Sequence, residues 1–353
     1  MRQLAATVRR TFALDWSQLT PGLALRLVPA LVIVLGVGLL AGDPRAAAVA
    51  VGGAFTVGFG TFQQFTSHRE APMLSAWVGI GVATFLGTLA GNSTAGMVLT
   101  AMLFAFWCGL LPALGMGAFW IGQQCAIFLL VAGAYAGGID QALARAALVM
   151  AGGLVQLVSY TIVVALERDP MPGLVPHRIL ADAATALSGL RFHVRLRSPY
   201  FAFALRCAAA LGVAVTAERL LAIPNGYWVA MTTLLLMRPD FQDLLPRSLG
   251  RIGGTIAGVG LATLATHVLG LGHETLAALV VVCAFLGFTT LRLNYGVFAL
   301  FLTGYVVFLL VLAGLAAAQV ATARIESTPL GAAIALAAQL DFYFRRRARD
   351  QVT

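Results

Sequence analysis

Two arginines stand four residues apart at the start of a long apolar run. At this spacing Arg247 and Arg251 share one face of a helix, and Arg251 lies close to the face of Gly254 and Gly258. Glycines so spaced let another helix backbone approach within a membrane, so we expect Arg251 to face other helices. A guanidinium there offers fork-shaped donors that match a carboxylate. We therefore predict Arg251 as an anion contact, with Arg247 and Arg238 forming a funnel that draws the anion in.

Two aromatic residues precede this pair, in the apolar run that ends at Arg238. Tyr227 and Trp228 offer flat apolar faces to an aromatic ring, but both could equally be belt residues at a membrane surface. Transport driven by protons needs a titratable group in the pathway. The candidates for that role are Asp240, Glu326 and His68, although Asp240 could form a structural pair with Arg238 and Glu326 one with Arg324.

The composition excludes most soluble classes. The 353 residues are 60% hydrophobic and only 10% charged, and the mean hydropathy is +0.89. This leaves too little polar material to cover a soluble domain, so we predict an all-α polytopic membrane protein. The four cysteines fall inside apolar runs without ligand spacing, and we expect neither a metal nor another cofactor.

The apolar runs form two similar series. The same short patterns occur in both series. The first begins with Thr20-Pro21 ahead of Ala24-Leu25-Arg26, and the second with Ser198-Pro199 ahead of Ala204-Leu205-Arg206. Near the end of each series an arginine precedes a glycine by seven residues, as Arg145 and Gly152 in the first and Arg324 and Gly331 in the second. Since a span needs roughly 20 apolar residues, we expect about 12 transmembrane helices in two diverged parallel repeats of six. The predicted spans are 23–41, 46–65, 72–91, 95–112, 118–136 and 143–166, then 201–217, 223–237, 248–270, 275–291, 296–315 and 325–343.

The arginines orient these spans. With twelve spans, nineteen of the twenty-three positive residues lie on the side of the two termini, and the other side holds Arg45, Arg145, Arg219 and Arg324. Positive residues concentrate in cytoplasmic loops, so both termini are predicted to be cytoplasmic and nucleic acid is not an expected partner.

The predicted organisation has five parts: an interfacial amphipathic helix (1–20), the first repeat (21–166), a cytoplasmic linker with an amphipathic helix (167–200), the second repeat (201–344) and a basic tail (345–353).

Short or interrupted spans at matching positions of two repeats point to a binding site. The second span of the first half contains Gly52, Gly53, Gly58 and Gly60, and Tyr227–Met237 in the second half measures only about 16 Å as a helix. A tilted or sunken helix at a thin place would explain the short run equally well. We predict the pathway at these two spans.

Residues Gly226 to Thr255, which read GYWVAMTTLLLMRPDFQDLLPRSLGRIGGT, resemble the signature of the fusaric-acid-resistance-like (FUSC) and aromatic acid exporter superfamily. The matching elements are Tyr227-Trp228, Arg238-Pro239-Asp240, and Arg247 with Arg251, Gly254 and Thr255; Asn294-Tyr295 and Arg324 to Gly331 also look like the family's second half. The first half matches only in its spans, because its corresponding loop from Gln63 to Glu70 has no Arg-Pro-Asp turn.

The resemblance implies a function and site residues. It suggests export of organic anions, probable substrates being aromatic carboxylates, from a bacterial inner membrane, and it adds Thr232 and Asn294 to the candidate substrate-binding residues. Plant aluminium-activated malate channels are similar to this superfamily, and basic residues of the equivalent helix face their anion pathway, which implies an anion role for Arg251. Larger members carry long cytoplasmic domains that are absent from these 353 residues, so a periplasmic adaptor does not carry over with the resemblance.

Several alternatives stay open. A passive organic-anion channel fits the same residues, and a non-transporting membrane scaffold fits the loss of the signature from the first half. Major facilitator transporters share the span count, but the loops SHREAP and RPDFQDLLPR lack their glycine-led motif. No nucleophile, metal or phosphate-binding motif for an enzyme appears. The expected partners are the lipid bilayer and a small organic anion, with a homo-oligomer left open.

Overall fold

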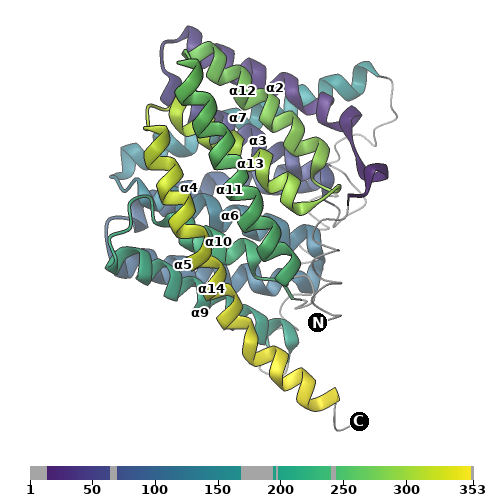
Figure 1. Ribbon diagram of the computed structural model, residues 1–353, viewed down its shortest axis with the longest axis vertical. Helices are drawn as coiled ribbons and strands as arrows, with labels where there is room; N and C mark the ends of the chain where they lie inside the picture. The colour runs from purple at the N-terminus through teal and green to yellow at the C-terminus, as the bar shows by residue number, and fades with distance from the viewer. Residues whose placement is uncertain (1–13, 64–69, 168–193, 196–197, 240–243, 351–353) are drawn as a thin grey trace.

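A computed structural model describes residues 14–63, 70–167, 194–195, 198–239 and 244–350 (Figure 1). Within these ranges every regular element is a helix, which confirms the all-α prediction. The twelve α-helices are α2 (Pro21–Leu40), α3 (Pro44–Phe59), α4 (Glu70–Ala90), α5 (Thr94–Leu110), α6 (Met116–Ala134), α7 (Ile139–Leu166), α9 (Pro199–Leu220), α10 (Tyr227–Leu236), α11 (Leu244–Leu269), α12 (His273–Thr290), α13 (Tyr295–Leu312) and α14 (Ala317–Asp350). The 3₁₀ helices η1 (Trp16–Gln18), η2 (Gly60–Phe62) and η3 (Leu111–Leu114) complete the described elements.

Each of the twelve predicted spans coincides with one α-helix, but ten helices of the described chain are long and apolar enough to cross a membrane. The exceptions are α10, which has only ten residues, and α14. The protein is therefore a multi-span membrane protein with about ten candidate spans, rather than twelve of equal character. Of the predicted interfacial helix (1–20), residues 1–13 lie outside the described residues, and residues 14–20 contain the 3₁₀ helix η1. Of the predicted linker (167–200), residues 168–193 and 196–197 lie outside the described residues.

Local sequence signals set the helix starts. Asp43 accepts a hydrogen bond from the Ala46 amide at 2.9 Å, and Pro44 occupies the first turn of α3. Ser93 caps α5 through the Gly96 amide at 3.0 Å. Such side chains satisfy amides that the first turn of a helix leaves without partners. The short loops between helices are thereby fixed as sharp reversals.

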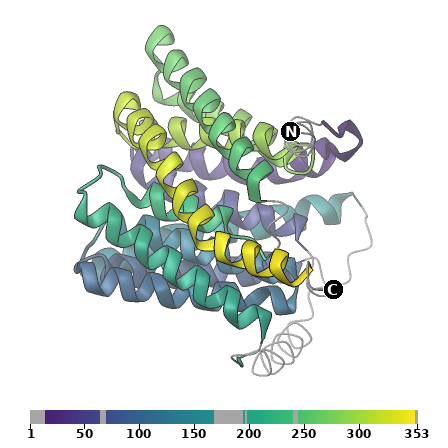
Figure 2. The ribbon, with the colours of Figure 1, turned by 60° about the horizontal axis from the view of Figure 1, so that its bottom comes forward.

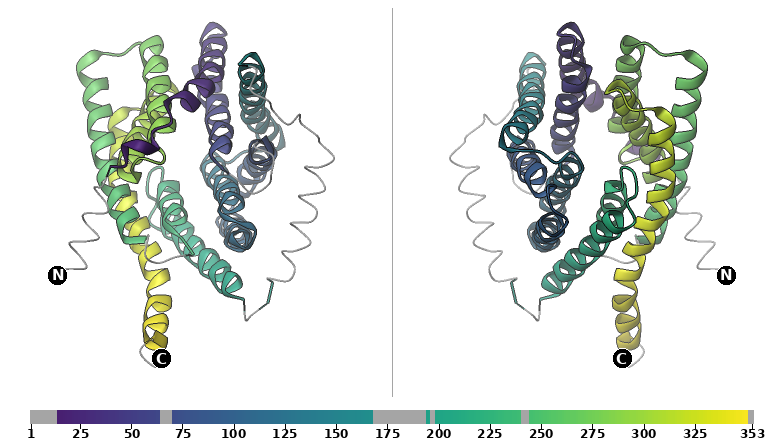
Figure 3. Two further views of the ribbon diagram at one scale, coloured as in Figure 1. Left: turned by 90° about the vertical axis from the view of Figure 1, so that its right-hand side faces the viewer. Right: turned by 90° about the vertical axis from the view of Figure 1, so that its left-hand side faces the viewer.

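The helices of the two halves pair in a corresponding manner. In the first half α3 packs on α7 and α4 on α6; in the second half α10 packs on α14 and α11 on α13. Across the halves, the first helix of one contacts the fourth helix of the other: α2 lies against α12, and α9 lies beside α5 (Figure 2). Figure 3 shows α14 running past the rest of the bundle toward the C-terminus.

Glycine stripes make the closest of these contacts. A Cβ on Gly254 would clash with the Gly296 carbonyl oxygen of α13, and one on Gly258 would lie 2.5 Å from the Leu300 oxygen. In the first half Gly87 and Gly91 leave the same room for α6. Close backbone approach supplies the van der Waals contact that holds helices together in lipid. The close packing predicted at Gly254 and Gly258 is confirmed, and the first half has a matching contact.

Two arginines tie the halves together at helix ends. Arg219, in the last turn of α9, donates to the Gly91 and Gly133 carbonyl oxygens at 3.3 and 3.2 Å, where α4 and α6 end. Arg45, near the start of α3, donates to the Ala313 carbonyl oxygen at the end of α13, at 3.2 Å. A cation is favourable at the C-terminal end of a helix. Each half thus caps the fifth helix of the other.

Replacing Arg219 by alanine is expected to lower the stability of the protein by about 2 kcal/mol, because two charge-assisted hydrogen bonds between the halves are lost. Thermal unfolding of the purified protein in detergent measures the effect. Arg206→Ala is the matched control, since Arg206 lies on the same helix and its Nε donates to the Ala202 carbonyl oxygen of that helix. Equal midpoints for the two variants would show that Arg219 does not join the halves.

Candidate functional site

The short helix α10 is enclosed by the bundle. Nine of its ten residues are buried, and it ends at Met237, whose backbone is extended (φ −64°, ψ 123°) ahead of Arg238-Pro239. The residue before a proline is displaced from the helical region, and proline cannot donate to the preceding turn. A helix surrounded by other helices does not need bilayer length. The short second span that the sequence predicts is therefore a buried core helix that delivers Arg238 to the inside of the bundle.

A cavity of about 650 Å³ lies beside α10. Its wall combines both halves: α3, η2 and α6 from the first, and α10, α11, α13 and α14 from the second. The second helix of each half, α3 and α10, contributes, as does the fifth helix of each half. Five arginines line the cavity, and none of the described lining residues is acidic: Arg238, Arg247, Arg251, Arg292 and Arg324.

Arg251 is the best-buried of the three arginines predicted for the site. Its side chain is 2% exposed, and its Nε and Nη1 atoms have no hydrogen-bond partner among the described residues. The stripe of Gly254 and Gly258, pressed against α13, turns this face of α11 inward. Taking an ion out of water costs several kcal/mol unless a counter-charge and hydrogen bonds compensate it. The described ion pair, Arg26–Glu167, does not line the cavity, and none of the described lining residues is acidic, so the described residues supply no carboxylate to Arg251.

The other arginines of the turn lie against aromatic rings. The Arg247 guanidinium carbon is 4.2 Å from the ring centroid of Tyr295, and that of Arg238 is 5.5 Å from the ring centroid of Phe119. Both arginines are partly exposed and line the cavity. Cation–π contacts of this kind contribute about 0.5–2 kcal/mol, so they help to orient the two side chains at the cavity.

The aromatic residues of α10 also face the cavity. Tyr227 and Trp228 are buried, with ring centroids 4.7 Å apart, and both line the cavity rather than the outer surface. Further rings come from α3 and α13: Phe55 stacks on Tyr305 at 4.0 Å and meets Phe59 edge-on at 4.8 Å. The cavity therefore combines a cationic part with an aromatic part.

This geometry coincides with a sequence match. Residues 208–338 match the fusaric acid resistance protein-like family. The second half of the chain carries a fusaric acid resistance protein-like domain. The resemblance inferred from Gly226 to Thr255 is confirmed, and the matched segment contains all of α10, α11, α12 and α13.

Three bacterial relatives resemble parts of the chain. They are the uncharacterized protein slr1298 of Synechocystis sp. (30% identical over 46% of this chain and 21% of the relative), the uncharacterized protein ORF2 of Neisseria gonorrhoeae (30% over 42% of this chain and 36% of the relative) and the uncharacterized protein YhfK of Escherichia coli (30% over 42% of this chain and 21% of the relative). The chain thus covers between a fifth and about a third of the length of these relatives. No solved structure matches the chain.

Within the fusaric acid resistance protein-like domain, Arg324 was placed wrongly by the sequence analysis. Arg324 was expected in a loop before a span starting at 325, whereas it lies two turns inside α14 and is 1% exposed. Its Nη2 donates to Thr303 Oγ1 at 3.0 Å, and its guanidinium carbon is 4.0 Å from the ring centroid of Trp228. The mistake arises because the helix begins in a stretch of alanine, threonine and glutamine that hydropathy does not separate from a loop. Arg324 was not among the predicted site residues, although its spacing from Gly331, matched by Arg145 and Gly152, was a usable signal.

The two polar residues that the resemblance added do not line the cavity. Asn294 is the N-cap of α13, and its side chain accepts hydrogen bonds from the Gly296 and Val297 amides at 2.7 and 3.2 Å. Thr232 is fully buried where α10 meets α14. A Cβ added to Gly331 of α14 would lie 2.8 Å from the Cβ of Thr232. Both residues therefore shape the site through helix starts and helix packing.

Of the three predicted coupling residues the structure describes Glu326, which is exposed on α14 and is not among the lining residues of the cavity. Asp240 and His68 lie outside the described residues. A buried acid that the sequence analysis missed is Glu218, in the last turn of α9. It is 8% exposed, its Oε2 has no hydrogen-bond partner among the described residues, and it acts electrostatically on Tyr227. Its position in an apolar run ahead of Arg219 was the signal available in the sequence.

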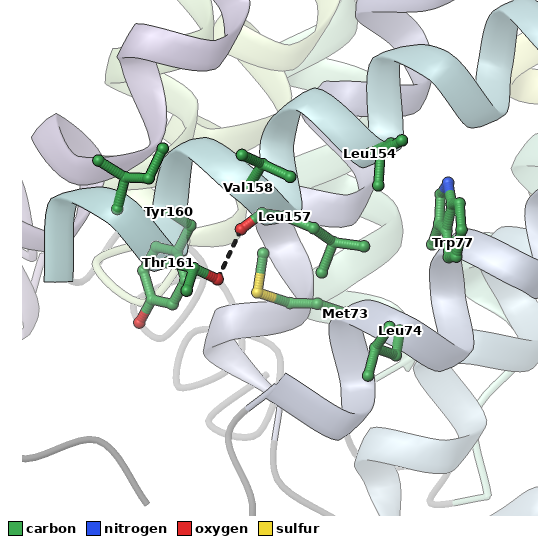
Figure 4. A pocket seen from close by; sticks show the side chains of 9 residues that line it. Met73, Leu74, Trp77, Leu154, Leu157, Val158, Tyr160 and Thr161 are labelled. Carbon is green, nitrogen blue, oxygen red and sulfur yellow. Dashed lines mark hydrogen bonds between the residues drawn. The ribbon is translucent and has the colours of Figure 1, made fainter. Parts of the chain in front are cut away.

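A second hollow, of about 320 Å³, lies between α4 and α7 and has a different character (Figure 4). Its walls carry Met73, Leu74 and Trp77 on one side and Leu154, Leu157, Val158 and Thr161 on the other. The polar groups here are satisfied within the protein: Thr161 donates to the Leu157 carbonyl oxygen and Trp77 to that of Met150, each at 2.8 Å. With no charged side chain among the described residues that line it, this hollow suits an apolar chain better than an anion.

Proposed function

We propose that the protein exports organic anions, aromatic carboxylates foremost, across a bacterial inner membrane. The observation that carries the proposal is the buried Arg251 guanidinium, which meets a cavity shared by both halves and has no acidic group among the described lining residues. An anionic group bound there compensates the charge, and the rings of α3, α10 and α13 accommodate an apolar or aromatic body. Arg251 is the primary contact, and Arg247 and Arg238 draw the anion in.

The proposed architecture has two diverged parallel six-helix repeats, 21–166 and 201–344, with both termini in the cytoplasm. The corresponding helix pairs within each half support it, and so do Gly152 and Gly331. A Cβ on Gly152 of α7 would clash with the Ala50 oxygen of α3, and one on Gly331 of α14 would lie 2.5 Å from the Val229 oxygen of α10. Matched contacts between the second and sixth helices favour a common ancestral unit. Transporters built from repeats place their substrate site where the repeats meet.

Efflux of preloaded acids from cells tests the proposal. Cells that produce the protein and cells that carry the empty vector are loaded with a panel of aromatic and aliphatic carboxylates, and the intracellular amounts are followed with time. Faster loss of some acids from the producing cells is the expected result. Equal loss across the panel would favour a non-transporting scaffold. Loss that follows only the gradient of the anion and is unaffected by collapsing the proton gradient would favour a passive channel.

A further inference from the structure

Arg324 has an environment that packing alone does not explain. It and Arg251 are the two largest side chains in the described protein that are buried almost completely. One edge of its guanidinium is fixed, because Nη2 donates to Thr303 Oγ1 at 3.0 Å. The remaining donors, Nε and Nη1, have no partner among the described residues, and neither has Nε1 of Trp228, whose ring lies 4.0 Å from the guanidinium carbon.

The position of Arg324 follows from the packing of α14 on α10. Gly331 lets α14 approach the Val229 carbonyl oxygen of α10. A residue seven positions earlier lies on the same face of a helix, so Arg324 faces α10 as well, where Trp228 is the neighbour of Val229. The glycine contact therefore holds the guanidinium at the cavity wall, with Arg324 among the lining residues.

The charge of the cavity is larger than one carboxylate can balance. Arg251 on α11 and Arg324 on α14 are both buried and both line the cavity. The positive charge of Arg251 is close enough to Arg324 to repel its charge. Like charges repel more strongly away from water, and neither arginine has an ion pair with a described acidic residue. The Trp228 ring attracts a cation more weakly than a carboxylate does. A ligand with one anionic group would leave one of the two guanidinia uncompensated.

We propose that Arg324, anchored by Thr303 and Trp228, forms a second anion subsite in the cavity, so that the preferred ligand carries two anionic groups. One group binds at Arg251 and the other at Arg324, with the body of the ligand between them. This inference rests on the proposed function, because it specifies the ligand of the same cavity.

Binding of benzoate and isophthalate to the purified full-length protein in detergent, measured by calorimetry at one fixed salt concentration, tests the second subsite. The two acids share a ring and differ by one carboxylate. Isophthalate is expected to bind at least about tenfold more tightly than benzoate. In Arg324→Gln the affinity for isophthalate falls about tenfold, while that for benzoate changes by less than about twofold. Arg324→Lys, which keeps the charge, retains a preference for isophthalate.

The matched control is Arg145→Gln. Arg145 occupies the same position relative to its glycine in the sixth helix of the first half, but it is partly exposed, is not among the lining residues of the cavity and donates to the Tyr135 carbonyl oxygen. It should leave both affinities unchanged. Thr303→Val removes the hydroxyl that holds Arg324 Nη2, and it should weaken the binding of isophthalate without changing that of benzoate. If Arg324→Gln does not fold, Thr303→Val and Arg324→Lys together test the second subsite.

The outcomes separate this inference from the proposed function. Equal binding of the two acids to the unmodified protein, or an equal loss of both in Arg324→Gln, would overturn the second subsite and leave anion export intact. Absence of binding for both acids, together with no efflux from cells, would overturn the proposed function and the subsite with it.

Discussion

Replacing Arg251 by glutamine is expected to lower anion efflux about a hundredfold while leaving membrane insertion unchanged. Removing one partner of a buried, hydrogen-bonded charge pair costs about 3 kcal/mol, and 1.4 kcal/mol corresponds to a factor of ten. Glutamine keeps the methylene stem and part of the hydrogen bonding of the side chain but not its full length or its charge. The measurement is the efflux of a transported carboxylate from cells with equal amounts of the two proteins in their membranes.

The comparison variant is Arg247→Gln. Arg247 is partly exposed and lies over the Tyr295 ring, so its charge acts mainly by attracting anions toward the cavity. Its loss should reduce efflux several-fold at most, and more at low ionic strength, because salt screens exposed charges. If both variants lost activity equally and with the same salt dependence, Arg251 would be one of several attracting charges and not the binding residue.

Much of this site was predictable from spacing. Arg247 and Arg251 at four-residue spacing, beside a glycine stripe at the same spacing, specify a helix face that is cationic at one end and closely packed beyond it. The structure has this arrangement on α11. The run 223–237 was counted among the twelve predicted spans although it is short, and the structure has a buried ten-residue helix there instead. Periodicity is a local property of the chain, whereas the burial of a whole helix depends on the helices around it.

Arg324 shows where local reasoning stops. It reaches the cavity because a glycine two turns later fits against a carbonyl oxygen of α10, a helix nearly a hundred residues earlier in the chain. No window of sequence contains both partners. For Asn294 the resemblance suggested a ligand role, and in the structure its side chain caps α13 in the way that short polar side chains do at helix starts. Its place immediately before an apolar run was a local signal for this cap that the sequence analysis did not use.

Gly254→Val is expected to destabilise the protein by about 3 kcal/mol and to abolish efflux. A Cβ at this position would clash with the Gly296 carbonyl oxygen and lie 2.9 Å from the Ala299 Cβ of α13. Both obstacles belong to a neighbouring helix, so the two helices must separate, and overpacking a closely packed contact costs 1–3 kcal/mol or more. Thermal unfolding in detergent and efflux from cells provide the two measurements.

The adjacent glycine supplies a control with the opposite sign. Gly253 is exposed, and a Cβ there would meet nothing within 4 Å. In Gly253→Ala the helix should gain about 0.5–1 kcal/mol, because glycine is a poor helix residue in the middle of a helix. Since Gly254 follows Arg251 by less than one turn, separating α11 from α13 displaces Arg251 relative to the residues of α13 that line the cavity. Stability and transport should therefore fall together in Gly254→Val, while Gly253→Ala keeps full transport with a higher unfolding midpoint. A Gly254→Val protein that unfolded at the normal temperature would show that the glycine stripe is not a packing surface.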